Sequence, residues 1–270
     1  MYAEAAWTMR LPHGPLTVYL QTDGFTMEAS HMCISHNSFI RGFNSIYQQA
    51  PRLKKSDYPD FITYSLAWHR LVEEHHRYEE TGLFLEIDKA TGQKGVMGKE
   101  VEQHGGSRIN NAKMRDARLT ILCTAAFHDG LDAFKAYLVG LKGKEGEFSF
   151  ARLIEIMDSF SQPLYTHLSE ELDSIVNLSR FSTPDNPINI VAIALKVGKQ
   201  AVTRDFALNC LPCFILNMEA VEFEGGMWQE FPPVNAPVRF VLLRVLPLWR
   251  RTVWRFASCG VNRARKQLAV

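Results

Sequence analysis

Apolar residues recur every three or four positions through most of the first two-thirds of the chain, the spacing of one face of an α-helix. The clearest run is 148–181, where apolar residues from Leu153 to Ile175 keep this spacing and Pro163 predicts a kink. Proline and glycine mark the helix ends elsewhere, as Pro51 and Gly92 do. The pattern predicts helices at 27–49, at 54–92, from about 96 with a further stretch at 127–141, and at 148–181.

Four helices with short connections and almost no strand signal predict an all-α fold, an antiparallel four-helix bundle. Residues 1–26 are predicted to be an irregular lead-in, because they contain several prolines and glycines. After residue 181, prolines, Gly225-Gly226 and tryptophans become frequent and helical periodicity fades. We therefore expect the bundle at 27–181, and at 182–270 an irregular C-terminal extension packed on it rather than an independent domain.

Composition narrows the function classes. The formal charge of +1, from 30 basic and 29 acidic residues, gives no overall attraction to nucleic acid. Five cysteines at scattered spacing favour reduced thiols and a cytoplasmic setting. No apolar run reaches the roughly 18 residues needed to span a bilayer. The nearest, 238–256, is interrupted by arginines; packing on the domain is the favoured interpretation, and peripheral membrane contact is the alternative.

Histidines are followed four positions later by a carboxylate more often than chance predicts. Nine histidines and 29 acids in 270 residues give roughly one such pair by chance. Because residues i and i+4 lie on the same face of a helix, each pair could present nitrogen and oxygen to one metal ion. The sequence contains five: His69/Glu73, His75/Glu79, His76/Glu80, His128/Asp132 and His167/Glu171.

Two of these pairs fall on apolar helix faces. His75 and Glu79 share a stripe with Leu71 and Leu83, and His167 and Glu171 share a face with their leucine neighbours. A buried polar pair is costly unless its members satisfy each other or bind something. His75 and His76 point about 100° apart, so we expect only one of them to face the bundle axis. Surface ion pairs remain the alternative for each pair.

Several segments resemble hemerythrin-like (HHE cation-binding) domains of the fungal branch. "HHRYEETGLF" (75–84) and "HLSEEL" (167–172) resemble the family's repeated His-x-x-x-Glu-Glu signature. "SHNSFIRGFNSIY" (35–47) is similar to its first-helix histidine segment, and "GVMGKEVEQH" with "FHDGLDAF" to its third helix. The similarity continues into the C-terminal extension.

The resemblance implies an up-down-up-down bundle that holds a non-haem di-iron centre, two carboxylate- or oxo-bridged irons that bind dioxygen. His76, Glu80 and Glu170 would orient the ligands through hydrogen bonds, and the remaining histidines would be structural or surface residues. Cys210-x-x-Cys213 has no second pair, which disfavours a zinc or redox role. The implied iron ligands are His36, His75, Glu79, His104, His128, His167 and Glu171.

One departure from the family pattern lies in the third helix. The family carries His-x-x-x-His there, whereas His104 and His128 are 24 positions apart. Removal of the 20 residues 106–125 would restore the spacing, so we hypothesise that this segment is an insertion or a retained intron. If the protein contains it, we expect a long loop that leaves the helix after His104 and returns before His128.

Three functions remain open. The first is a dioxygen-binding di-iron protein. The second is an enzyme, a non-haem di-iron oxygenase or oxidase that tailors a small organic substrate, a fungal secondary metabolite, with a cavity lined by Phe39, Phe43, Tyr78 and Phe160. The third is a metal-free helical scaffold in which the insertion has disrupted the site.

Overall fold

The computed structural model describes residues 23–98 and 117–270, with the backbone alone at 117–126 and 201. Within these ranges all regular secondary structure is helical, and one isolated bridge between Cys259 and Arg265 is the only β-type pairing. The prediction of an all-α fold is therefore confirmed. No helix in these ranges has the length and apolarity to cross a membrane.

Four long helical segments carry the core. The Asp23 side chain accepts a hydrogen bond from the Phe25 backbone N–H at the start of the first, and Ser149 caps the last in the same way. The second is continuous through a π-helical segment, and Gly92, at φ 69°, ends it. The segments are α1 (Gly24–Gln49), α2 (Tyr58–Tyr78) with η3 (Glu79–Leu83) and α3 (Phe84–Thr91), α5 (Ala117–Gly140), and α6 (Phe150–Asn177) with η5 (Leu178–Phe181).

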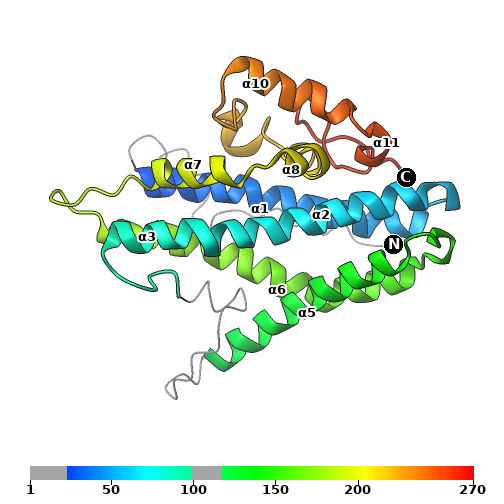
Figure 1. Cartoon of the computed structure of the whole chain (residues 1–270), viewed down its shortest axis with the longest axis horizontal. Coiled ribbons are helices and arrows are strands. Elements are labelled where there is room, and N and C mark those ends of the chain that lie inside the picture. The colour runs from blue at the N-terminus through cyan, green and yellow to red at the C-terminus, as the bar shows by residue number, and fades with distance from the viewer. Residues whose placement is uncertain (1–22, 99–116) are drawn as a thin grey trace.

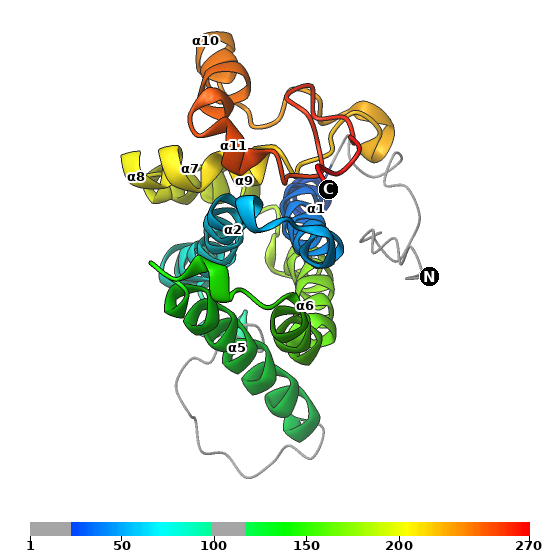
Figure 2. The same ribbon diagram turned by 90° about the vertical axis from the view of Figure 1, so that its right-hand side faces the viewer.

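These segments pack side by side, as Figure 2 shows almost end-on: α1 contacts α2 and α6, and α5 contacts the same two helices. Trp68 lies at the centre of the core, with its ring against Phe43, Phe134 and Phe160. Gly42 lets α1 approach this indole closely, because a Cβ there would lie 2.4 Å from Trp68 Cδ1. Large aromatic side chains thus pack this part of the core.

The helix bounds differ from the prediction in two places. α1 begins at Gly24, within the expected lead-in, and residues 1–22 lie outside the described residues. α5 begins at Ala117, so residues 117–125 of the proposed insertion are helical and continuous with the helix that carries His128. The expectation that the whole segment forms a loop is therefore wrong for 117–125.

The C-terminal segment forms a further helical layer over α1 and α2 (Figure 1). Asn217 ties it to α2, since its side-chain amide donates to the Tyr64 hydroxyl at 2.9 Å. The expectation that helical structure fades after residue 181 is wrong, because Asn189 caps a 12-residue helix. The elements are α7 (Ile190–Ala201), α8 (Arg204–Asn209), α9 (Leu211–Ile215), η6 (Phe223–Gly226), α10 (Ala236–Phe240), η7 (Val241–Val245), η8 (Leu246–Leu248) and α11 (Arg251–Trp254).

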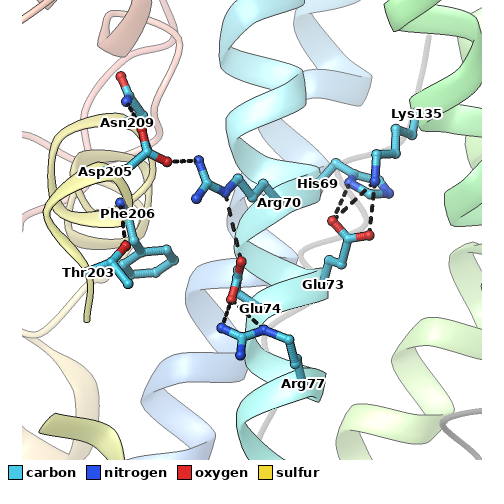
Figure 3. A network of polar contacts seen from close by, with 10 residues as sticks. All are labelled: His69, Arg70, Glu73, Glu74, Arg77, Lys135, Thr203, Asp205, Phe206 and Asn209. Atoms are coloured by element: carbon cyan, nitrogen blue, oxygen red, sulfur yellow. Dashed lines mark hydrogen bonds and ion pairs between the residues drawn. The ribbon is translucent and has the colours of Figure 1, made fainter. Parts of the chain in front are cut away.

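Charged side chains join the outer face of α2 to its neighbours (Figure 3). Arg70 forms an ion pair with Asp205 of α8 at 2.5 Å, and Lys135 of α5 pairs with Glu73 at 3.0 Å. Such exposed pairs contribute only about 0.2–1 kcal/mol each. Apolar packing, rather than these contacts, therefore holds the layers together.

Candidate metal centre

Four side chains from three helical segments converge in the core. His36 comes from α1, His75 from α2, Glu79 from the π-helical segment η3 and Glu171 from α6. One nitrogen or oxygen atom of each lies within 4.8 Å of those of the other three. His36 Nε2 lies 3.1 Å from His75 Nε2 and 3.4 Å from a Glu171 oxygen, and His75 Nε2 lies 2.8 Å from a Glu79 oxygen.

Burial makes this group unusual. His36, Glu79 and Glu171 are fully buried, and the side chain of His75 is only 11% exposed. The Phe39 ring packs edge-on against His75, with 4.7 Å between ring centroids. Two carboxyl groups rarely lie together in an apolar core unless a proton or a cation offsets their charge.

The His36 ring is held in one orientation. Its Nδ1 lies 2.8 Å from the Leu168 carbonyl oxygen, which can only accept, so Nδ1–H donates this hydrogen bond. The proton on Nδ1 leaves the Nε2 lone pair directed at the group. Histidine ligands of protein metal sites commonly use this arrangement, in which a backbone carbonyl fixes the tautomer and the ring plane.

The carboxyl groups strengthen the case for a cation. Burial, and secondly the charge of Glu171, raises the pKa of Glu79 well above its ordinary value of 4.5. Without an ion, Glu79 therefore favours its protonated form. Two imidazoles with two carboxylates are a donor set that suits iron and other first-row divalent metals, so the residues present fit such an ion.

The π-helical segment explains how α2 keeps its buried stripe. Leu71, His75, Glu79, Leu83 and Ile87 lie four residues apart and face inward. In an α-helix each four-residue step would rotate the side chain by about 40° away from that face. The Phe84 N–H instead bonds to the Glu79 carbonyl, five residues earlier, and this wider turn absorbs part of the drift.

Three further histidines form a second cluster beside the first. His76 packs against His167 and His128, with ring centroids 5.1 Å and 6.2 Å apart, and the Phe127 ring contacts all three. His75 and His76 are neighbours in α2, and their ring centroids lie 5.8 Å apart. The two groups therefore adjoin across α2.

The structure places six of the seven predicted ligands, in two groups. His36, His75, Glu79 and Glu171 form the first group, whereas His128 and His167 lie in the second cluster. His104 lies outside the described residues.

The expectation that only one of His75 and His76 faces inward is wrong. His76 is 5% exposed, because α2 is flanked by α1 on one side and α5 on the other. Its spacing gave a usable signal, since it follows Val72 by four positions and precedes Phe84 by eight.

His31 and His69 pack against aromatic side chains, and His13 lies outside the described residues. His69 stacks on Phe134 and forms an ion pair with Glu73 at 3.9 Å, seen in Figure 3. His31 bonds to Glu28 and packs against Trp228 of the C-terminal layer. Both therefore stabilise contacts between helices.

Cys210 and Cys213 are free and buried. Burial raises the pKa of Cys210 to about 11 and that of Cys213 further, the opposite of what a reactive thiolate needs. The CxxC pair therefore packs as apolar core.

The aromatic residues predicted to line a substrate cavity have different surroundings. Phe39 contacts His75 in the first group. Phe43 and Phe160 pack around Trp68, and the Tyr78 hydroxyl donates to the Ala194 carbonyl of α7 at 3.1 Å. Phe39 is thus the aromatic residue of the four that the structure places against the candidate centre.

Comparison with known proteins gives one distant relative. The chain is 26% identical over 248 residues to the dimeric xanthone biosynthesis cluster protein R11 of Cryptosporiopsis sp. (strain 8999), a fungal protein. The match covers 89% of this chain and 81% of the relative. No protein-family model matches the chain, and no solved structure does. The chain is therefore a distant relative of a protein from a fungal biosynthesis cluster, and at this identity the match assigns no family.

Proposed function

We propose that this chain is a hemerythrin-like metal-binding protein, an up-down-up-down four-helix bundle with a non-haem di-iron centre that binds dioxygen. The observation that carries the proposal is the convergence of His36, His75, Glu79 and Glu171 from three helical segments into one buried group. We place the protein in the cytoplasm, because Cys33, Cys210, Cys213 and Cys259 are buried and free of disulfides in the described part of the chain.

The two groups have distinct roles in this proposal. The first group would hold one ion, with Glu79 and Glu171 offsetting its charge. His128 and His167, together with neighbouring His76, would hold the second. Iron, when bound, supplies the capacity to bind or activate dioxygen. The chain holds the ligand atoms, fixes His36 through the Leu168 carbonyl and excludes bulk water by burial.

Metal analysis of the full chain tests the proposal. We expect iron to bind after anaerobic addition of ferrous ion, and the optical spectrum to gain oxo-bridge bands under air. His36→Ala and Glu171→Ala should lower the affinity of the first group for iron more than about a hundredfold, since loss of a ligand costs more than the 10–100-fold typical of an outer partner. The control Glu73→Ala removes a half-exposed carboxylate of α2 and should leave iron binding unchanged.

The absence of bound metal in the parent chain, under conditions where the parent and Glu73→Ala are both folded, would refute the proposal. The metal-free scaffold would then remain. Equal loss in Glu73→Ala and Glu171→Ala would show that the iron binds nonspecifically to surface carboxylates.

A di-iron oxygenase or oxidase is the second candidate, and the relative favours it, because that protein is named for a dimeric xanthone biosynthesis cluster. An oxygen electrode separates the two candidates. The iron-loaded chain is mixed with a hydroxyxanthone as a probe. Continuous oxygen uptake that depends on the probe and is lost in His36→Ala supports the enzyme, whereas a single stoichiometric uptake supports the carrier or sensor.

A further inference from the structure

The outermost helical run of the C-terminal layer presents apolar side chains to solvent. The run is continuous from Ala236 to Leu248 and comprises α10, η7 and η8, followed by Trp249. In Figure 1 it lies at the top of the molecule, separated from the four long helices by the rest of the layer. Its exposed apolar residues, termed the apolar face here, are Val238, Phe240, Val241, Val245, Leu248 and Trp249.

The spacing shows that this exposure is systematic. Val238, Val241, Val245 and Leu248 follow one another at intervals of three, four and three, so they share one side of the run. Leu248 is 67% exposed and Phe240 63%, values usual for charged side chains. A helix whose solvent side is apolar over three turns marks an interaction surface.

The charged residues of the segment that carries the apolar face have one sign. Residues 231–270 contain eight basic residues and no acidic one. Arg239 and Arg255 are engaged by Glu230 and Asp57. Arg244, Arg250 and Arg251 are exposed and lie within or directly after the run. Exposed apolar residues beside exposed arginines are the composition of segments that lie on anionic membranes.

We propose that the apolar face binds the surface of a membrane that contains anionic lipid. Phe240, Leu248 and Trp249 enter the boundary between headgroups and acyl chains, and the three arginines lie at the phosphate level. A second copy of the chain is the poorer occupant, because two-fold pairing of this face would bring the arginines of both copies together. The proposal is independent of metal loading.

Vesicle flotation of the full chain tests this proposal. We expect binding to phosphatidylcholine vesicles that contain phosphatidylserine, little binding to phosphatidylcholine alone, and release by high salt. Replacement of Arg244, Arg250 and Arg251 by Gln should lower the partition coefficient about a hundredfold, from about fivefold for each arginine. Phe240→Ser/Leu248→Ser/Trp249→Ser should abolish binding.

Matched controls separate this face from general exposure. Leu85→Ser/Val139→Ser/Phe150→Ser removes three comparably exposed apolar residues from α3, α5 and α6 and should leave binding intact. Circular dichroism verifies that each variant is folded. No binding of the folded parent at low salt overturns the proposal. So does a dimer of the parent in sedimentation that Phe240→Ser/Leu248→Ser/Trp249→Ser dissolves, because the occupant is then a second copy.

Discussion

Replacement of Glu79 by glutamine should have opposite effects on metal binding and on the stability of the metal-free chain. Burial and Glu171 raise the pKa of Glu79 well above its ordinary value of 4.5. A carboxyl that stays protonated in the folded chain but ionises in the unfolded chain costs about 1.4 kcal/mol for each unit by which the pH exceeds the unfolded pKa, up to the folded pKa. Glu79→Gln keeps the shape and removes this cost, but it also removes a ligand.

The sign of the pH dependence follows from the raised pKa. Stability of the metal-free parent is greatest below the unfolded pKa of about 4.5, as far as this group is concerned, and falls as pH rises towards the folded pKa. The difference in stability between Glu79→Gln and the parent should therefore be near zero at pH 4.5 and grow as the pH rises from there towards the folded pKa.

Urea unfolding in the presence of EDTA, measured from pH 5 to pH 8, gives the stability of the metal-free chain and its pH dependence. Metal analysis after addition of ferrous ion gives the bound iron. Glu73→Gln on the same helix is the control and should stay within about 0.5 kcal/mol of the parent. If Glu79→Gln is less stable than the parent throughout this range, the buried carboxyl is not a cost of the metal-free fold and the reasoning fails. If Glu79→Gln binds as much iron as the parent, Glu79 is not a ligand.

Three further substitutions test contacts that hold the helices against one another. Gly130→Ala should destabilise by about 1–3 kcal/mol, because a Cβ there would lie 2.5 Å from Phe160 Cβ, whereas Gly140→Ala on the same helix meets open space and should be neutral or stabilising in thermal melts. Asn217→Ala should cost about 1–3 kcal/mol in urea unfolding, because it strands the buried Tyr64 hydroxyl and the Cys213 carbonyl. Arg70→Ala should cost less than about 1 kcal/mol, since its ion pair with Asp205 is exposed; a larger loss would mean that α8 docks through this pair.

The parts of the fold that the sequence predicted are those with an unbroken periodic pattern. α6 has its buried residues at helical spacing over more than twenty positions, and α1 keeps large apolar residues buried at the same spacing. Polar caps mark where both helices begin. The same periodicity placed His75 with Glu79, and His167 with Glu171, on apolar faces. It could not show that Glu171 points to His36 while His167 points to His76, because α6 lies between two neighbours and the crossing of helices decides which one each side chain meets.

The periodicity of the sequence could not predict the π-helical segment η3 either. A pattern read at 3.6 residues per turn assigns each residue one angle, and a five-residue hydrogen bond at Glu79 shifts every later angle. The prediction that only one of His75 and His76 faces inward likewise assumed that a single side of the helix is covered. In the structure α2 is covered on two sides, so adjacent histidines reach different groups.

The separation of the predicted ligands into two groups affects the interpretation of residues 106–125. The first group draws its ligands from α1, α2, η3 and α6 and none from α5, so an insertion before His128 leaves it intact. The second cluster includes His128, and α5 carries it on a helix whose first nine residues belong to the segment in question. We therefore expect the first group to hold iron with or without residues 106–125, and removal of the segment to raise the occupancy of the second cluster. Equal iron in both chains would show that the restored spacing of His104 and His128 is not needed, and the hypothesis of a retained intron would then lose its chemical support.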